Sequence, residues 1–61
     1  MNNEIEFERI NILIVLRRKN GESTLQLYIR YEQNIKHLIN LGYDISELET
    51  LKDVKDVKIS W

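Results

Sequence analysis

The chain has 61 residues, 43% of them hydrophobic, and nine Lys and Arg against ten Asp and Glu give a net charge of −1. A chain of this size buries only about 60% of the surface that its unfolded form exposes, so we expect one marginally stable domain over residues 1–61, with residues 1–3 frayed. The balanced charge is not that of a globally basic nucleic-acid-binding protein, and no apolar run is long enough to span a membrane.

The residue types offer little chemistry. The chain has no Cys and a single His, His37, which are too few ligands for a structural zinc site. No glycine-rich phosphate loop or nucleophile motif is present. We therefore expect a non-enzymatic protein without cofactor or metal, with His37 on its surface. The lack of cysteine fits a reducing compartment, and the acidic start is unlike a signal peptide, so we expect a cytoplasmic location.

The first segment with a clear pattern is residues 4–8, in which acidic and apolar side chains alternate. Alternation with period two favours a β-strand. Ile5 and Phe7 are out of phase with Ile10, so a strand here needs a β-bulge or places these two side chains on the second face of the sheet. A short helical turn or a flexible arm is the alternative.

Residues 9–32 predict a long antiparallel β-hairpin that turns at Asn20-Gly21. Asn-Gly favours a two-residue hairpin turn, because both central residues of a type I′ turn need a positive φ. With this register, most of the apolar side chains sort onto one face, which supports the pairing. The paired residues on that face are Ile10 with Tyr31, Ile12 with Ile29, Ile14 with Leu27, and Leu16 with Leu25.

After the hairpin the apolar period becomes helical. Ile35, Leu38 and Ile39 predict a helix over residues 32–41 that packs on the Ile10-to-Leu16 face of the hairpin. Gly42 is expected to end it with a left-handed residue, and Tyr43 to pack back over the last turn.

The last part of the chain predicts a second short helix and a strand. Ser46 and Glu49 have the spacing of a capping box, which predicts a helix over residues 47–53 with Leu48 and Leu51 turned inward. Alternation over residues 57–61 then predicts a C-terminal strand that runs parallel to the strand before the helix, the second arm of the hairpin. Placed beside the first arm, it gives the sheet order 2-1-3. The predicted fold class is α+β with a ββαβ-like order.

A competing fold makes residues 10–16 and 24–41 helical, as in a small helical or winged-helix protein. Apolar residues of the second segment, among them Leu25, Tyr28 and Ile29, approximate a helical stripe. The β-branched residues between positions 10 and 15 favour the strand instead.

Two functional hypotheses follow. In the first, Leu13, Val15 and Tyr28 form an apolar patch on the sheet face that the helix leaves open, and Trp61 is an interface anchor. This patch predicts a small protein-interaction module, acting as a homodimer or as an accessory subunit.

The alternative hypothesis is nucleic-acid binding. Arg17, Arg18 and Lys19 fall at the predicted hairpin tip, and Arg30 extends the basic patch. A β-ribbon with a basic tip is able to contact phosphates in a nucleic-acid groove. Glu22 opposite Lys19, and the frequency of exposed charges at hairpin tips, weigh against this hypothesis.

Overall fold

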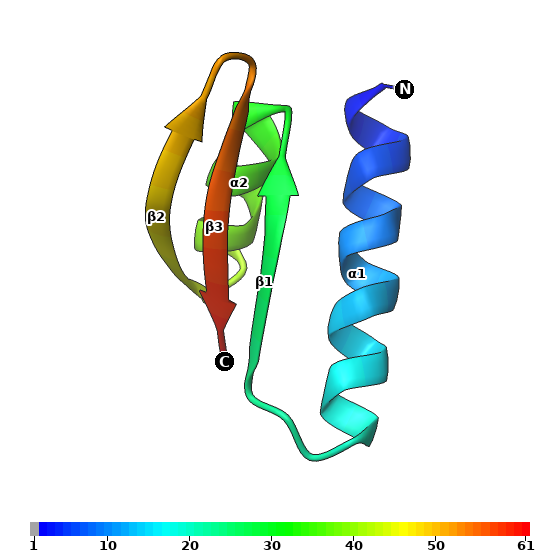
Figure 1. The fold of residues 1–61 in the computed structure, drawn as a ribbon. Helices are drawn as coiled ribbons and strands as arrows, with labels where there is room; N and C mark the ends of the chain where they lie inside the picture. The colour runs from blue at the N-terminus through cyan, green and yellow to red at the C-terminus, as the bar shows by residue number, and fades with distance from the viewer. Residues whose placement is uncertain (1) are drawn as a thin grey trace.

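The computed structural model describes residues 2–61 and has an α+β fold, with two helices and a three-stranded antiparallel sheet (Figure 1). The predicted fold class is therefore confirmed, whereas the order of the elements differs from the predicted one. The elements in chain order are α1 (Asn3–Lys19), β1 (Thr24–Ile29), α2 (Glu32–Asn40), β2 (Asp44–Leu51) and β3 (Val54–Ser60).

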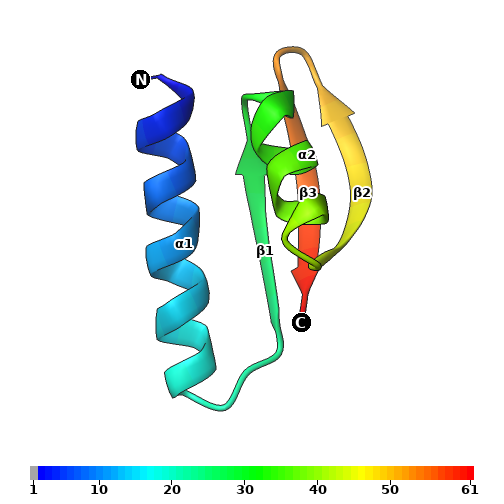
Figure 2. The same ribbon diagram turned by 180° about the vertical axis from the view of Figure 1, so that it is seen from behind.

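The C-terminal strand β3 is the centre of the sheet, which has the order β1-β3-β2. A C-terminal strand was predicted correctly, but its predicted parallel direction and edge position are wrong, because β3 is antiparallel to both neighbours. The helical crossover that we expected before β3 instead joins β1 to β2, which run parallel on either side of it. Seen from both sides, α2 packs over one face of the sheet and α1 lies alongside β1 (Figures 1 and 2).

The predicted hairpin over residues 9–32 is wrong, because its first arm belongs to α1. Gly21 does have a positive φ, of 78°, but it closes a helix. Its N–H donates to the carbonyl of Arg18 at 3.0 Å, and the N–H of Glu22 donates to the carbonyl of Arg17 at 2.9 Å. These two bonds are a Schellman motif. The positive φ predicted for the Asn-Gly turn is confirmed at Gly21 and wrong at Asn20, whose φ is −87°. A helix C-terminus needs one left-handed residue, whereas a type I′ turn needs two.

Signals at both ends favour α1 over a strand. The side chain of Asn2 accepts a hydrogen bond from the N–H of Ile5 at 2.9 Å, as an N-cap does. Acidic residues in the first turn and basic residues in the last turn complement the helix dipole. Residues 4–8 are therefore helical, but they belong to the long helix α1 and not to the short helical turn of the alternative. Of the residues expected to fray, Met1 lies outside the described residues, and Asn2 and Asn3 are part of the capped helix start.

The apolar alternation at positions 10, 12, 14 and 16 has a different meaning on a helix. Ile10 and Ile14 are buried, as predicted, with 1% of each side chain exposed. Ile12 and Leu16 were predicted to lie on the same face and are exposed instead. Residues four apart share a helix face and residues two apart do not, so one strand-like stripe becomes two helical stripes on opposite sides.

The second arm of the predicted hairpin is a strand, β1. Leu25 and Ile29 are buried, with Leu27 packed against the core between them. Gln26 and Tyr28 are exposed on the other face of the sheet, as the predicted alternation had them.

The prediction of α2 is confirmed to within one residue. Ile35 and Leu38 are buried, but Ile39 is exposed, contrary to the prediction. Gly42 has a φ of 101°, and the N–H of Tyr43 donates to the carbonyl of Leu38 at 3.1 Å, so a second Schellman motif closes this helix.

The predicted short helix over residues 47–53 is wrong. These residues form the end of β2 and the turn at Lys52-Asp53, where Leu51 pairs with Val54. The register shifts between Glu47 and Glu49, which places Leu48 at a bulge. Pairing with the central strand prevails over the local capping signal, because the helix that this signal predicted would have had only two turns. The competing fold is right about residues 10–16 and wrong about a helix through residues 24–41.

Both helices contribute to one core on a single face of the sheet. Its buried apolar side chains come from every element except β2, and Phe7, Leu27, Tyr43, Ile45 and Trp61 pack around them. The buried apolar residues are Ile10, Ile14, Leu25, Ile29, Ile35, Leu38, Val57 and Ile59.

Candidate protein-interaction surface

The most distinctive surface of the structure is an apolar stripe along α1. We call it the outer face of α1 and define it by four side chains: Ile5, 44% exposed; Ile12, 60%; Val15, 48%; and Leu16, 51%. A shallow hollow of about 240 Å³ lies over Asn11, Ile12, Val15 and Leu16. A contiguous apolar patch on the surface of a folded chain is a candidate contact site.

The outer face lies opposite the face that α1 buries. Successive residues of a helix are rotated by about 100° around its axis, so the four outer positions fall within an arc of about 100°. The inward positions 6, 7, 10 and 14 fall within a second arc of about 100°, and the centres of the two arcs are half a turn apart. The sheet and α2 lie to one side of α1, and no other element lies on its far side (Figures 1 and 2). The helix therefore has two apolar faces, and within residues 2–61 only one is covered.

The carboxylate of Glu6 fixes the orientation of α1. Its side chain is 7% exposed and accepts hydrogen bonds from the backbone N–H of Arg30 at 2.7 Å and of Tyr31 at 3.1 Å. It also accepts one from Nδ2 of Asn34 at 2.8 Å, and the same amide donates to the backbone carbonyl of Asn3 at 2.9 Å. Because these groups lie at the start of α2, the carboxylate serves as a cap supplied from another helix.

The residues predicted as a partner interface are not gathered on one surface. Val15 lies on the outer face of α1, and Leu13, 38% exposed, lies on the flank of the same helix. Tyr28 is exposed on the open face of the sheet. Trp61 packs against the core, with its ring 6.4 Å from that of Tyr43 in an edge-to-face arrangement.

Ile12 and Leu16 were not among the predicted interface residues, and Ile5 was predicted to join Leu13 and Val15 only if residues 4–8 continue the second face of the sheet. Their spacing, with Ile12 seven and Leu16 eleven residues after Ile5, is that of one helix face. This signal becomes visible only once residues 3–19 are taken as a helix, and the strand interpretation assigned Ile12 and Leu16 to the core.

The basic residues predicted to contact nucleic acid are also separated. Arg17, Arg18 and Lys19 form the last turn of α1 instead of a hairpin tip. Arg17 pairs with Glu22 at 2.9 Å, and the guanidinium of Arg18 lies over the rings of Tyr43 and Trp61 at 5.5 and 5.7 Å. Arg30 directly follows β1, and the C-terminal ends of α1 and β1 lie at opposite ends of the molecule (Figure 1). The four side chains therefore do not form one patch.

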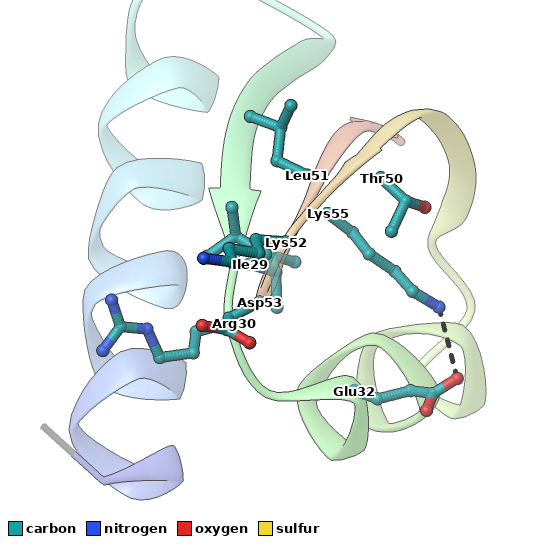
Figure 3. A pocket seen from close by; sticks show the side chains of 9 residues that line it. Ile29, Arg30, Glu32, Thr50, Leu51, Lys52, Asp53 and Lys55 are labelled. Carbon is teal, nitrogen blue, oxygen red and sulfur yellow. Dashed lines mark hydrogen bonds and ion pairs between the residues drawn. The ribbon is translucent and has the colours of Figure 1, made fainter.

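A second hollow, of about 200 Å³, lies between the end of β1, the β2–β3 turn and the start of α2 (Figure 3). Nζ of Lys55 lies 3.0 Å from a carboxylate oxygen of Glu47 and 3.3 Å from one of Glu32. These two carboxylates raise the pKa of Lys55, with the larger effect from Glu47. Lys55, Glu47 and Glu32 are thus engaged with one another. The lining residues are Ile29, Arg30, Glu32, Thr50, Leu51, Lys52, Asp53, Val54 and Lys55.

His37 lies in a third hollow, of about 290 Å³, between α1 and α2. It is on the surface, as predicted, and its ring stacks on that of Phe7 with centroids 4.2 Å apart and 4° between the planes. Within residues 2–61 no three His, Asp or Glu side chains are grouped closely enough to hold a metal ion. This stacked pair joins the two helices.

Comparison with models of protein families, with curated proteins and with solved structures finds no match to this chain. Within residues 2–61, neither helix has the length and apolar character that crossing a membrane requires. Evidence about function therefore comes from the surface of the molecule itself.

Proposed function

We propose that the chain is a small, non-catalytic protein-interaction module that works as a homodimer through the outer face of α1. The observation that carries this proposal is the second apolar stripe of α1, which lies opposite the core and includes Ile12, at 60% the most exposed of its four side chains. An accessory subunit of a larger assembly would present the same surface.

A second copy of the chain suits this surface because a two-fold axis brings the same stripe to both sides of the contact. Fully burying an aliphatic side chain contributes about 1.5–3 kcal/mol, so burying the exposed half of each contributes about 1 kcal/mol. Eight such side chains in a dimer then supply about 8 kcal/mol, from which the cost of association is subtracted. We therefore expect a weak dimer that dissociates on dilution.

Sedimentation equilibrium between about 5 and 500 μM tests the proposal. The parent chain should show a concentration-dependent increase in mass toward that of a dimer, and Val15→Lys should remain a monomer, because the interface would bury an unpaired charge. Ser46→Lys is the matched control, since it adds the same charge at an exposed position of β2 and should leave association unchanged. A parent chain that is monomeric throughout this range contradicts homodimerisation.

The nucleic-acid hypothesis has lost the structural feature on which it rested, a basic hairpin tip, and no contact in the structure favours it. It stays a prediction from the sequence. The test is binding of the parent chain to duplex or single-stranded probes at low salt. Binding that weakens when Arg17, Arg18 and Lys19 are replaced by Ala would support this hypothesis.

A further inference from the structure

We propose that two copies pair their α1 helices antiparallel, with Glu8 of each copy opposite Lys19 of the other. This inference rests on the proposed function, because it specifies how the second copy lies on the outer face of α1. It follows from the order of charged and apolar residues along that face.

The outer face has the spacing of a coiled-coil seam. Ile5, Glu8, Ile12, Val15 and Lys19 are separated by three, four, three and four residues, which is the spacing of alternating a and d positions in heptads. Leu16 flanks the seam beside Ile12 and Val15. Apolar residues thus occupy the middle of the seam, with an acidic residue on one side of the centre and a basic residue on the other.

The two charged residues of the seam are available for a partner. Among the contacts of residues 2–61, Glu8 and Lys19 form no ion pair, and both side chains are exposed. Three other charged side chains near the helix ends are engaged within the fold: Glu6 binds the start of α2, Arg17 pairs with Glu22, and Arg18 lies over Tyr43 and Trp61.

The direction of pairing follows from symmetry. In a parallel two-fold pair each residue meets its own copy, so Glu8 would face Glu8 and Lys19 would face Lys19, and like charges would repel. In an antiparallel pair whose axis lies between Ile12 and Val15, these two residues face each other. Glu8 precedes Ile12 by four residues and Lys19 follows Val15 by four, so the same axis brings Glu8 opposite Lys19.

The position of α1 leaves room for this arrangement. The helix forms one side of the molecule, and the sheet and α2 lie on its other side in both views (Figures 1 and 2). A second α1 approaching from outside does not meet either of them. The core residues Ile10 and Ile14 are on the opposite side of the helix, so pairing requires no rearrangement of the fold.

Charge reversal in the full chain tests the pairing. In sedimentation equilibrium, Glu8→Lys alone and Lys19→Glu alone should each weaken dimerisation by about fivefold or more, since each places like charges opposite one another. The double variant should recover dimerisation to within about twofold of the parent, because both charge pairs are restored with their signs exchanged. Circular dichroism of each variant shows whether α1 remains folded.

Cysteine cross-linking gives an independent readout, because the chain has no cysteine of its own. A mixture of the Ile12→Cys and Val15→Cys variants should form the mixed disulfide under mild oxidation. The Ile5→Cys variant should not cross-link to itself, since in an antiparallel pair the two copies of residue 5 are about 25 Å apart at a rise of about 1.5 Å per residue.

The outcomes separate this inference from the proposed function. A dimer that cross-links through Ile5→Cys, or whose double charge variant stays as weak as the single ones, overturns the antiparallel pairing and leaves homodimerisation standing. A parent chain that is monomeric up to about 500 μM overturns both.

Discussion

At the scale of single residues, the carboxylate of Glu6 connects three parts of the fold. Glu6 lies in α1, and its carboxylate oxygens accept hydrogen bonds from the backbone N–H groups of the two residues before α2. The side-chain amide of Asn34 donates both to this carboxylate and to the backbone carbonyl of Asn3. Hydrogen bonds to a charged group contribute more than neutral ones, and a buried group that loses its partner carries a desolvation cost.

Glu6→Ala should therefore lower the free energy of unfolding by about 2–4 kcal/mol, as measured by urea denaturation followed by circular dichroism. Glu6→Gln should cost less, because one acceptor oxygen remains. Glu4→Ala is the control: this exposed acid lies in the same first turn, and its loss should cost at most about 1 kcal/mol through the helix dipole. Equal effects at the two positions would contradict the role of Glu6.

Lys55 gives a pH dependence of defined sign. Its pKa is raised above the usual 10.5 by Glu47 and then Glu32, so the native state holds this proton more tightly than the unfolded state. The stabilisation is therefore fully present below about pH 10.5 and is lost as the pH rises through the native pKa.

We expect the free energies of unfolding of the parent and of Lys55→Met to differ most below about pH 10.5 and to converge as the pH rises through the native pKa of Lys55, measured by urea denaturation at a series of pH values. Lys58→Met is the matched control, because Lys58 is exposed on the neighbouring part of β3 and forms no ion pair within residues 2–61. A difference that grows as the pH rises would contradict the assigned sign.

At the scale of elements, α1 combines two apolar stripes that alternate in sequence. A strand with the same residues would put Ile10, Ile12, Ile14 and Leu16 on one face, and the helix divides them between the core and the solvent. The sequence did not reveal this, because the spacing of four between Ile10 and Ile14 satisfies both a strand and a helix.

Alanine substitutions of two isoleucines in α1 test this division directly. Ile14→Ala should lower the free energy of unfolding by about 2–5 kcal/mol, since it leaves a cavity among buried side chains. Ile12→Ala removes the same atoms from the opposite side of the helix and should change stability by no more than about 0.5 kcal/mol in dilute solution. Urea denaturation at a few micromolar compares them, and similar losses at both positions would show that α1 is oriented differently.

Strand β2 is a second case in which a local sequence pattern predicted the wrong structure. The spacing of Ser46 and Glu49 fits a capping box, yet these residues pair with β3 through a two-residue turn that contains no glycine. Sequence rules recognise tight hairpins chiefly by residues that favour a positive φ, and within residues 2–61 no residue other than glycine has one. The residue types at Lys52-Asp53 therefore did not predict the turn.

At the scale of the whole molecule, stability and association should be linked. A partner that binds only the folded chain raises its apparent stability by mass action, so the melting temperature of a homodimer depends on concentration. For a chain of this size, each kilocalorie per mole of added unfolding free energy raises the melting temperature by about 4–8 °C.

We expect the melting temperature of the parent chain to rise by several degrees, about 4–8 °C, between about 5 and 500 μM. That of Val15→Lys should stay constant over the same range, and Ser46→Lys should behave like the parent. Differential scanning calorimetry provides the measurement. A melting temperature that is independent of concentration in the parent would contradict a dimer at these concentrations.

By itself, the sequence determined the features that depend on neighbouring residues: the α+β class, the helix over residues 32–40 with its end at Gly42, the inward side chains of β1, and the C-terminal strand. Only the tertiary structure decided whether residues 3–19 form a helix or a strand, because apolar alternation and Asn-Gly are compatible with both. It also decided the sheet order, since a strand is completed by partners far away in the chain. With β3 paired on both sides, residues 3–19 cover the flank of β1 as a helix whose second apolar face remains exposed.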